Sequence, residues 1–220
     1  MLKAFIFDLD GTLIDSLADI AGCINRMLEA RGYPPCHDTG VFRQMVGDGM
    51  EKLVERALPE GARTEELIRV CTEEYRAFYD THWQDQTRPY DQISETLAAL
   101  KDRGIKVGVI SNKAHRFTVP MTEHFFGAGL FDVILGQRPD VPRKPAPDGG
   151  LEAAALLGLR PEECAYVGDS GIDMAFAQSA GLYGIGVDWG FRTVQELTEH
   201  GARIIISQPG ELLEILDKSR

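Results

Sequence analysis

From about residue 88 to the carboxyl end of the chain, short apolar runs alternate with segments of helical periodicity. Parallel strands need crossover connections and are buried on both faces. The alternation therefore predicts an α/β fold, a Rossmann-like core in which helices cover both faces of a doubly wound, mainly parallel sheet. The strand-like runs, rich in β-branched or aromatic side chains, lie at about residues 3–8, 105–110, 131–135, 164–168, 183–187 and 202–206.

Residues 16–87 have helical periodicity but no convincing strand. Glycine and proline breaks at 31–35, 47–49 and 59–61 divide this region into about four helices. We expect residues 1–15 and 88–220 to form the catalytic core, and residues 16–87 to form a small all-helical cap domain. An insertion directly after the first strand would lie over the carboxyl end of that strand, so it is expected to act as a lid.

Two segments depart from these regular patterns. Pro120 falls inside the apolar segment 117–126, where an interior proline would cost ~3 kcal/mol. We therefore expect that helix to begin near Pro120, where the missing N–H costs little. Residues 136–150 are rich in proline and glycine and predict a loop.

The charge balance excludes several classes of partner. The chain has 34 acidic and 23 basic residues and a formal net charge of −11, which argues against binding to nucleic acid or to an anionic membrane. Four scattered cysteines without a CxxC pair indicate neither zinc nor disulfides. The apolar stretch after Lys3 meets Asp8 after four residues, which is too short for a signal sequence, and no apolar run reaches 18 residues. We expect a cytoplasmic protein, either a monomer or a homodimer.

The first strand ends in two aspartates, Asp8 and Asp10. Two like charges at ~4 Å repel by about 1 kcal/mol in water and about 4 kcal/mol at an effective dielectric of 20. This repulsion requires a cation or a proton to offset it. Mg²⁺ is the obvious candidate.

Polar side chains also follow later strands, and in open parallel sheets ligands bind beyond the carboxyl ends of the strands. Ser111, Asn112 and Lys113 follow the strand at 106–110 and offer a hydroxyl, an amide and an ammonium to an anionic oxygen. Lys144 follows the strand at 131–135, and Asp169, Ser170 and Asp173 follow the strand at 165–168. Carboxylates of this kind suit Mg²⁺ together with a substrate phosphate, so the expected reaction class is phosphoryl transfer. Ser170 and Asp173 also predict an ordinary helix cap.

Four segments in order along the chain resemble the motifs of the haloacid-dehalogenase-like hydrolases, and specifically of their phosphoglycolate-phosphatase branch. The segments are DLDGTLIDS at 8–16, SNK at 111–113, KPAP at 144–147 and VGDSGIDMAFAQSAG at 167–181. The resemblance covers nearly the whole chain, including the inserted helical region. It implies a phosphatase of this fold. The departures are mild: Ser111 stands where threonine is commoner, and Gln137-Arg138-Pro139 replaces a glycine-aspartate turn.

The resemblance implies roles for individual residues. Asp8 would attack the phosphoester and form an aspartyl-phosphate, and Asp10 would protonate the leaving alkoxide and then activate water. Mg²⁺ would lie between a side-chain oxygen of Asp8, the backbone carbonyl of Asp10 and the carboxylate of Asp169. Ser111 and Lys144 would bind the transferring phosphoryl oxygens. Two residues would support this set without touching the phosphorus: Asp173, orienting Lys144 or metal-bound water, and Ser170.

Substrate choice is expected to belong to the helical region. Arg43 and the loop at 46–49, which ends in Gly49, resemble the family's cap segment. Arg43 is a candidate to pair with a substrate carboxylate such as that of 2-phosphoglycolate, although an ordinary surface arginine explains it equally well. None of the five histidines falls in a motif.

The leading expectation is a Mg²⁺-dependent phosphomonoesterase that acts on a small phosphorylated metabolite, first of all 2-phosphoglycolate. Relatives with near-identical motifs act on pyrophosphate, nucleotides or sugar phosphates, so these substrates stay open. A phosphomutase resembling β-phosphoglucomutase would use the same Asp8 and Asp10. A sensor of phosphorylated metabolites that retains the fold without turnover is the non-enzymatic alternative.

Overall fold

The computed structural model describes residues 1–218 and divides the chain into two compact units. One unit contains Met1–Ile14 and Pro89–Arg220, and the other contains Asp15–Arg88. Each division lies one residue from the boundary expected from the sequence. None of the helices that the structure describes combines the length and the apolar character that a membrane crossing requires.

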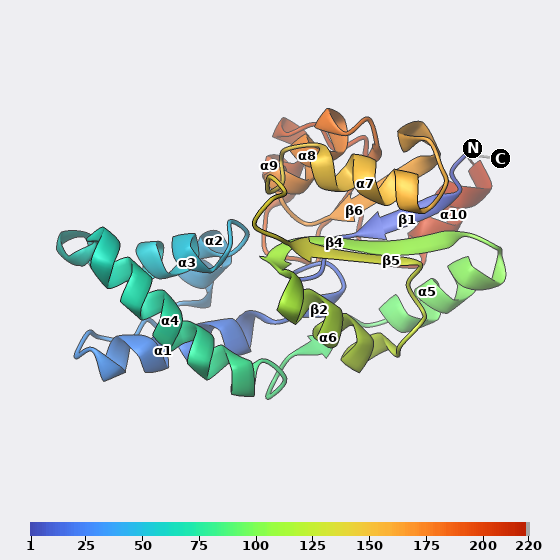
Figure 1. Ribbon diagram of the computed structural model, residues 1–220. Coiled ribbons are helices and arrows are strands. Elements are labelled where there is room, and N and C mark those ends of the chain that lie inside the picture. The colour runs from blue at the N-terminus through green and yellow to red at the C-terminus, as the bar shows by residue number, and fades with distance from the viewer. Residues whose placement is uncertain (219–220) are drawn as a thin grey trace. The chain divides into compact units, whose positions relative to one another are not determined.

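The larger unit is built on a six-stranded parallel sheet with the order β5-β4-β1-β6-β7-β8 (Figure 1). This confirms the expected fold class and all six strand-like runs. The strands are β1 (Ala4–Phe7), β4 (Lys106–Ala114), β5 (Val133–Gln137), β6 (Cys164–Gly168), β7 (Tyr183–Val187) and β8 (Ile204–Ile206).

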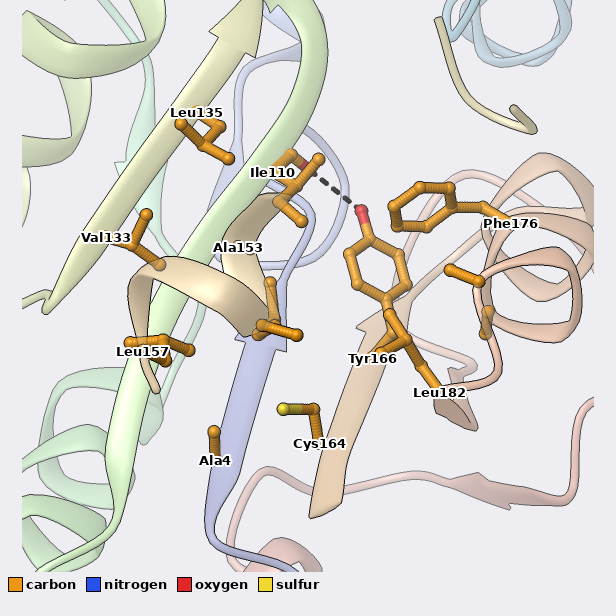
Figure 2. Packing of buried hydrophobic residues seen from close by; sticks show 14 residues of the cluster. Ala4, Ile110, Val133, Leu135, Ala153, Leu157, Cys164, Tyr166, Phe176 and Leu182 are labelled. Carbon is orange, nitrogen blue, oxygen red and sulfur yellow. Dashed lines mark hydrogen bonds between the residues drawn. The ribbon is translucent and has the colours of Figure 1, made fainter. Parts of the chain in front are cut away.

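Helices cover both faces of this sheet, as the alternating pattern predicts. Helices α7 (Asp148–Leu156) and α8 (Gly171–Ser179) lie on one face, and α5 (Ile93–Asp102) and α6 (His115–Phe126) lie on the other (Figure 1). The remaining elements of this unit are η2 (Pro161–Glu163), α9 (Val194–Glu199) and α10 (Glu211–Lys218). The apolar cluster under α7 and α8 includes Ile6, Ile110, Tyr166 and Phe176, all at most 5% exposed (Figure 2).

Strand β1 is central, and its neighbours fix where its carboxyl end opens. Phe7 at the end of β1 is paired in register with Val109 of β4 and with Val167 of β6. The strands that follow β1 along the chain lie on both sides of it, β4 and β5 on one side and β6, β7 and β8 on the other. This is the topological switch point at which open α/β sheets bind ligands.

The smaller unit is helical, as expected for residues 16–87. Its elements are α1 (Leu17–Ala30), α2 (Thr39–Met45), α3 (Met50–Ala57), η1 (Glu60–Ala62) and α4 (Glu65–His82). Helix α1 packs against α4 and places Ile20, Cys23, Ile24 and Met27 in the interior. The periodicity that predicted these helices thus corresponds to buried faces.

The two chain segments that join the units pair with each other. Strands β2 (Ile14–Asp15) and β3 (Arg88–Pro89) form a two-stranded sheet that the sequence did not suggest. The buried carboxylate of Asp19, at the start of α1, accepts hydrogen bonds from the backbone N–H groups of Gln86 and Thr87 and from the Thr87 hydroxyl. The entering and the leaving segments are therefore held together by backbone pairing and by one buried acid.

Three local expectations were wrong. Helix α6 begins at His115, and Pro120 lies inside it. The proline removes one N–H bond to the carbonyl four residues earlier, but the burial of Phe117 and Met121 on either side of it offsets the loss. Helix α7 begins at Asp148, within the segment expected to be a loop. Ser111, Asn112 and Lys113 belong to β4, which continues with an irregular register to Ala114.

Candidate active site

The first-strand aspartates are presented by a tight turn after β1. The N–H groups of Thr12, Leu13 and Ile14 all donate to the carbonyl of Leu9, and the N–H of Gly11 donates to the carbonyl of Ile14. Gly11 has a φ of 85°, which glycine adopts without steric cost. This turn reverses the chain immediately after Asp8 and Asp10, so both remain at the carboxyl end of the sheet.

Three carboxylates meet at this edge of the sheet. One oxygen each of Asp8, Asp169 and Asp173 can be chosen so that all three lie within 4.8 Å of one another. Asp8 follows β1, Asp169 follows β6, and Asp173 lies in the first turn of α8. The adjacency of β1 and β6 therefore brings together acids that are about 160 residues apart in the sequence.

Burial and mutual repulsion act on two of these acids. Burial is the main cause that raises the pKa of Asp8 to about 6, against the opposing effect of the Lys144 ammonium. Burial, followed by the charges of Asp173 and Asp8, raises the pKa of Asp169 to about 8. Without a further cation, the site holds more negative charge than its surroundings stabilise.

Lys144 is the buried cation of the cluster. Its Nζ lies 2.7 Å from Asp173 Oδ1 and 3.0 Å from Asp8 Oδ1, and its side chain is 4% exposed. The charges of Asp173 and Asp8 outweigh the effect of burial and raise the pKa of Lys144. The lysine is therefore charged at neutral pH and lies between two carboxylates.

The backbone of Lys144 is held by Asn112. The Lys144 N–H donates to Asn112 Oδ1 at 2.9 Å, and Asn112 Nδ2 donates to the Lys144 carbonyl at 3.1 Å. The amide of Asn112 thus connects β4 to the loop that carries Lys144. Its expected contact with substrate stays a prediction.

Lys113 pairs with Asp10. Its Nζ lies 3.1 Å from Asp10 Oδ1 and 2.9 Å from Asp10 Oδ2, and both side chains are largely buried. The sequence suggested Lys113 as a ligand of an anionic oxygen but did not pair it with this aspartate. Neighbouring Ser111 is buried, and its Oγ accepts a hydrogen bond from the Lys113 N–H.

Asp173 and Ser170 form the helix cap that the sequence predicted. Ser170 Oγ accepts from the Asp173 N–H, and Asp173 Oδ2 accepts from the Ser170 N–H and hydroxyl. Both oxygens of Asp173 are therefore engaged, one with Ser170 and the other with Lys144. This arrangement suits the expected role of Asp173 in holding Lys144, which stays a prediction.

The remaining carboxylates fit a divalent cation. Asp8 Oδ1 is buried and accepts no hydrogen bond from any residue in 1–218, although Lys144 forms an ion pair with it. Asp169 accepts from the Thr12 hydroxyl through Oδ1 and from the Phe191 N–H through Oδ2. Hard oxygen donors with an uncompensated negative charge are the ligands that Mg²⁺ prefers, so the residues present suit this ion.

Several residues around these acids carried no signal that we used in the sequence. Gly190 approaches Asp169, Trp189 Nε1 donates to the Thr12 carbonyl, and the Tyr166 hydroxyl contacts Lys144. Tyr166 is the one that could have been noticed, because a hydroxyl in the middle of a strand expected to be buried on both faces requires a polar partner.

Two further candidate residues, Arg43 and Gly49, belong to the helical unit. Arg43 is exposed in the last turn of α2, and Gly49, with a φ of 89°, precedes α3. The loop between them is held by Arg56, which donates to the Met45 carbonyl and pairs with Asp48. Their proposed contact with substrate stays a prediction.

Comparison with known proteins gives consistent results. A family model described as "Haloacid dehalogenase-like hydrolase" matches residues 5–187. A phosphoglycolate phosphatase of Chromobacterium violaceum is 34% identical, with 98% of this chain and 96% of that protein covered. An N-acetylmuramic acid 6-phosphate phosphatase of Pseudomonas aeruginosa is 32% identical, with 99% and 96% covered. The crystal structure of a predicted phosphoglycolate phosphatase from Haemophilus somnus superimposes with a TM-score of 0.90 at 28% identity, with 98% of each chain covered.

Proposed function

Because this chain belongs to the haloacid dehalogenase-like hydrolases and is a phosphatase of that family, we propose that it is a Mg²⁺-dependent phosphomonoesterase whose principal substrate is 2-phosphoglycolate. The observation that carries the proposal is the cluster of Asp8, Asp169 and Asp173 around Lys144 at the end of β1. Phosphatases that are 32–34% identical over nearly the whole chain support it.

In the proposed first step, a carboxylate oxygen of Asp8 attacks phosphorus and the bond to the leaving oxygen breaks. Lys144 holds Asp8 by its charge at 3.0 Å, and Ser111 and Lys144 bind the phosphoryl oxygens that carry the developing charge. Asp10 gives a proton to the leaving alkoxide. When Asp10 holds that proton its ion pair with Lys113 is lost, so we expect Lys113 to turn to a phosphoryl oxygen at this stage.

In the second step, Asp10 takes a proton from water, and the water oxygen attacks the phosphorus of the aspartyl-phosphate. The bond between phosphorus and the Asp8 oxygen breaks, and phosphate leaves. Asp8, the backbone carbonyl of Asp10 and Asp169 would hold Mg²⁺. The ion, when bound, supplies positive charge to the phosphoryl oxygens.

The test is phosphate release in MgCl₂ from 2-phosphoglycolate, N-acetylmuramic acid 6-phosphate, pyrophosphate and glucose 1-phosphate. We expect the highest kcat/KM for 2-phosphoglycolate and a loss of at least about 10³-fold in Asp8→Asn, because the nucleophile is removed. An Asp8→Asn protein that turns over like its parent would overturn the mechanism.

Sugar phosphates are the second candidate substrates, because the Pseudomonas aeruginosa relative is named for one. A higher kcat/KM for N-acetylmuramic acid 6-phosphate would transfer the assignment to this class. Conversion of glucose 1-phosphate into an isomer without phosphate release would indicate a mutase. Absence of turnover on every compound would favour the sensor.

Arg43 provides a separate test of specificity. If its guanidinium pairs with the substrate carboxylate, Arg43→Ala lowers kcat/KM for 2-phosphoglycolate by about 10-fold. The same substitution should leave kcat/KM for p-nitrophenyl phosphate, which has no carboxylate, nearly unchanged. Arg69→Ala, which removes another exposed arginine of the same helical unit, is the matched control. Equal losses on both substrates would show that Arg43 does not set specificity.

A further inference from the structure

Tyr166 is a buried polar residue in the middle of β6. Its side chain has no exposed surface, and its ring makes an edge-on contact with Phe176 at a centroid distance of 4.7 Å and an interplanar angle of 76°. Figure 2 shows the ring within the apolar cluster and its hydroxyl pointing at Ile110. The hydroxyl is therefore a polar group enclosed by the apolar cluster, and it needs polar partners there.

The direction of the hydrogen bonds at this hydroxyl follows from its partners. The carbonyl of Ile110 can only accept, so the Tyr166 O–H, at 2.8 Å, donates to it. The hydroxyl oxygen then accepts from Lys144 Nζ, also at 2.8 Å. Burial raises the pKa of Tyr166 well above its usual value, so the proton stays on the hydroxyl.

Lys144 has three N–H donors and three oxygens around it. Asp173 Oδ1 lies at 2.7 Å, the Tyr166 hydroxyl at 2.8 Å and Asp8 Oδ1 at 3.0 Å. Asp173 and Asp8 are anions that the cation contacts in any case. Tyr166 is the neutral member, and it connects the Lys144 ammonium to the Ile110 carbonyl within β4.

We infer that Tyr166 is a positioning residue, whose hydroxyl holds the Lys144 ammonium beside Asp8 and joins it to the residue before Ser111. Lys144 and Ser111 come from different segments. Asn112 ties the Lys144 backbone to β4, and the hydrogen-bond chain from Nζ through Tyr166 to the Ile110 carbonyl positions the ammonium itself. Removal of the hydroxyl would leave a buried donor and a buried carbonyl without that partner. The inference rests on the proposed function, in which both groups bind the same phosphoryl group.

The first experiment compares Tyr166→Phe with Tyr183→Phe. The control removes the same hydroxyl from a residue on neighbouring β7, outside the site. We expect Tyr166→Phe to lower kcat by about 10-fold, as the loss of one hydrogen bond to a charged group implies. KM is expected to change by less than about 2-fold, since Lys144 acts mainly on the charge that develops during transfer. Tyr183→Phe should match the parent in both constants.

A double-mutant cycle asks whether Tyr166 acts through Lys144. The measured quantity is the dissociation constant of orthovanadate, a mimic of the phosphoryl group during transfer, in MgCl₂, determined by calorimetry. In the parent background, Tyr166→Phe should weaken vanadate binding by about 10-fold, and in Lys144→Met it should have no further effect. Equal weakening in both backgrounds, or none in the parent, would overturn the inference. Lys144→Gln replaces Lys144→Met if the latter does not fold.

A readout independent of turnover separates this inference from the proposed function. In protein labelled with ¹⁵N at the lysine side chains, the Lys144 ammonium resonance is identified by its absence from Lys144→Met. We expect it to shift and to exchange with solvent faster in Tyr166→Phe than in Tyr183→Phe. An unchanged resonance would contradict the role of Tyr166, whereas a parent without phosphatase activity would contradict only the proposed function.

Discussion

At the scale of single residues, the position of Asp169 depends on two glycines. A Cβ on Gly11 would lie 2.4 Å from Asp169 Oδ2, and a Cβ on Gly190 would lie 2.3 Å from Asp169 Cβ. The backbone of two separate segments therefore contacts the carboxylate directly. Any side chain there would have to displace the proposed metal ligand, and such displacements impair metal binding.

This argument gives a prediction for Gly190, whose φ does not require glycine. Gly190→Ala should raise the Mg²⁺ concentration needed for half-maximal activity by about 10-fold, because the added methyl displaces Asp169. Gly210→Ala is the control, since a Cβ at Gly210 meets no atom within 4 Å. The measurement is a Mg²⁺ titration of phosphate release. Identical titrations for the two variants would show that the site tolerates a displaced Asp169.

At the scale of elements, the first turn of α8 serves both the helix and the site. The Ser170 side chain caps the helix, and its hydroxyl lies 2.6 Å from Asp173 Oδ2. Through its other oxygen, Asp173 contacts Lys144 at 2.7 Å. An ordinary helix cap is therefore connected to the buried cation by a single carboxylate.

Comparison of two caps tests this connection. Ser170→Ala and Thr64→Ala should each destabilise the protein by about 1 kcal/mol, because each removes an N-cap acceptor. Thr64 caps α4 in the helical unit. We expect only Ser170→Ala to lower kcat, since only that change frees Asp173 to move. Urea unfolding and phosphate release measure the two effects, and a loss of kcat in both variants would attribute it to stability alone.

At the scale of the whole molecule, folding itself creates the demand for a cation. The unfolded chain keeps Asp8 and Asp169 apart and hydrated, whereas the folded chain buries them with Asp173 at one edge of the sheet. Their pKa values rise from an ordinary 3.8 to about 6 and about 8. Between about pH 4 and pH 8 the folded state therefore binds more protons than the unfolded state.

The sign of the resulting pH dependence follows from linkage. Stability falls as pH rises wherever the folded state holds more protons. In EDTA, the contribution of Asp8 and Asp169 to the free energy of unfolding should therefore decrease between about pH 4 and pH 8. Mg²⁺ should restore stability, and more strongly at pH 8 than at pH 5, because protons compete with the ion at low pH.

Urea unfolding at pH 5, 6.5 and 8 in EDTA and in MgCl₂ tests this expectation. Asp169→Asn is the control that removes the group with the higher pKa. It should weaken both the pH dependence and the response to Mg²⁺. A parent protein whose stability in EDTA rises from pH 5 to pH 8, or does not respond to Mg²⁺, would contradict the linkage.

The sequence predicted the sheet well because its signals are local. Each of the six strands is a short apolar run, and each sequence prediction overlaps the observed strand within a few residues. Helix α6 shows the limit of local reasoning. Pro120 predicts a helix start, but Phe117 and Met121 pack against the sheet only in the folded protein, and their burial decides where the helix begins.

In the candidate site too, some features followed from the sequence and others only from the folded structure. Asp8 and Asp169 were proposed because charged residues that directly follow predicted strands collect at one edge of a parallel sheet. Lys144 and Asp173 lie several residues beyond a strand end, and their roles came from the family resemblance. The pairing of Lys113 with Asp10, and that of Asn112 with the Lys144 backbone, could not be predicted. These pairings depend on side-chain rotamers and on the path of a loop, for which the sequence holds no periodic signal.

The positions of the strands along the chain, the kind of residue at each strand end and the family are determined by the sequence alone, because apolar patterning and motif spacing act over short stretches of chain. Only the tertiary structure placed the Tyr166 hydroxyl against Lys144 and two glycine backbones against Asp169. Such contacts join segments far apart in the chain, and their distances are fixed by how the sheet and the helices pack together.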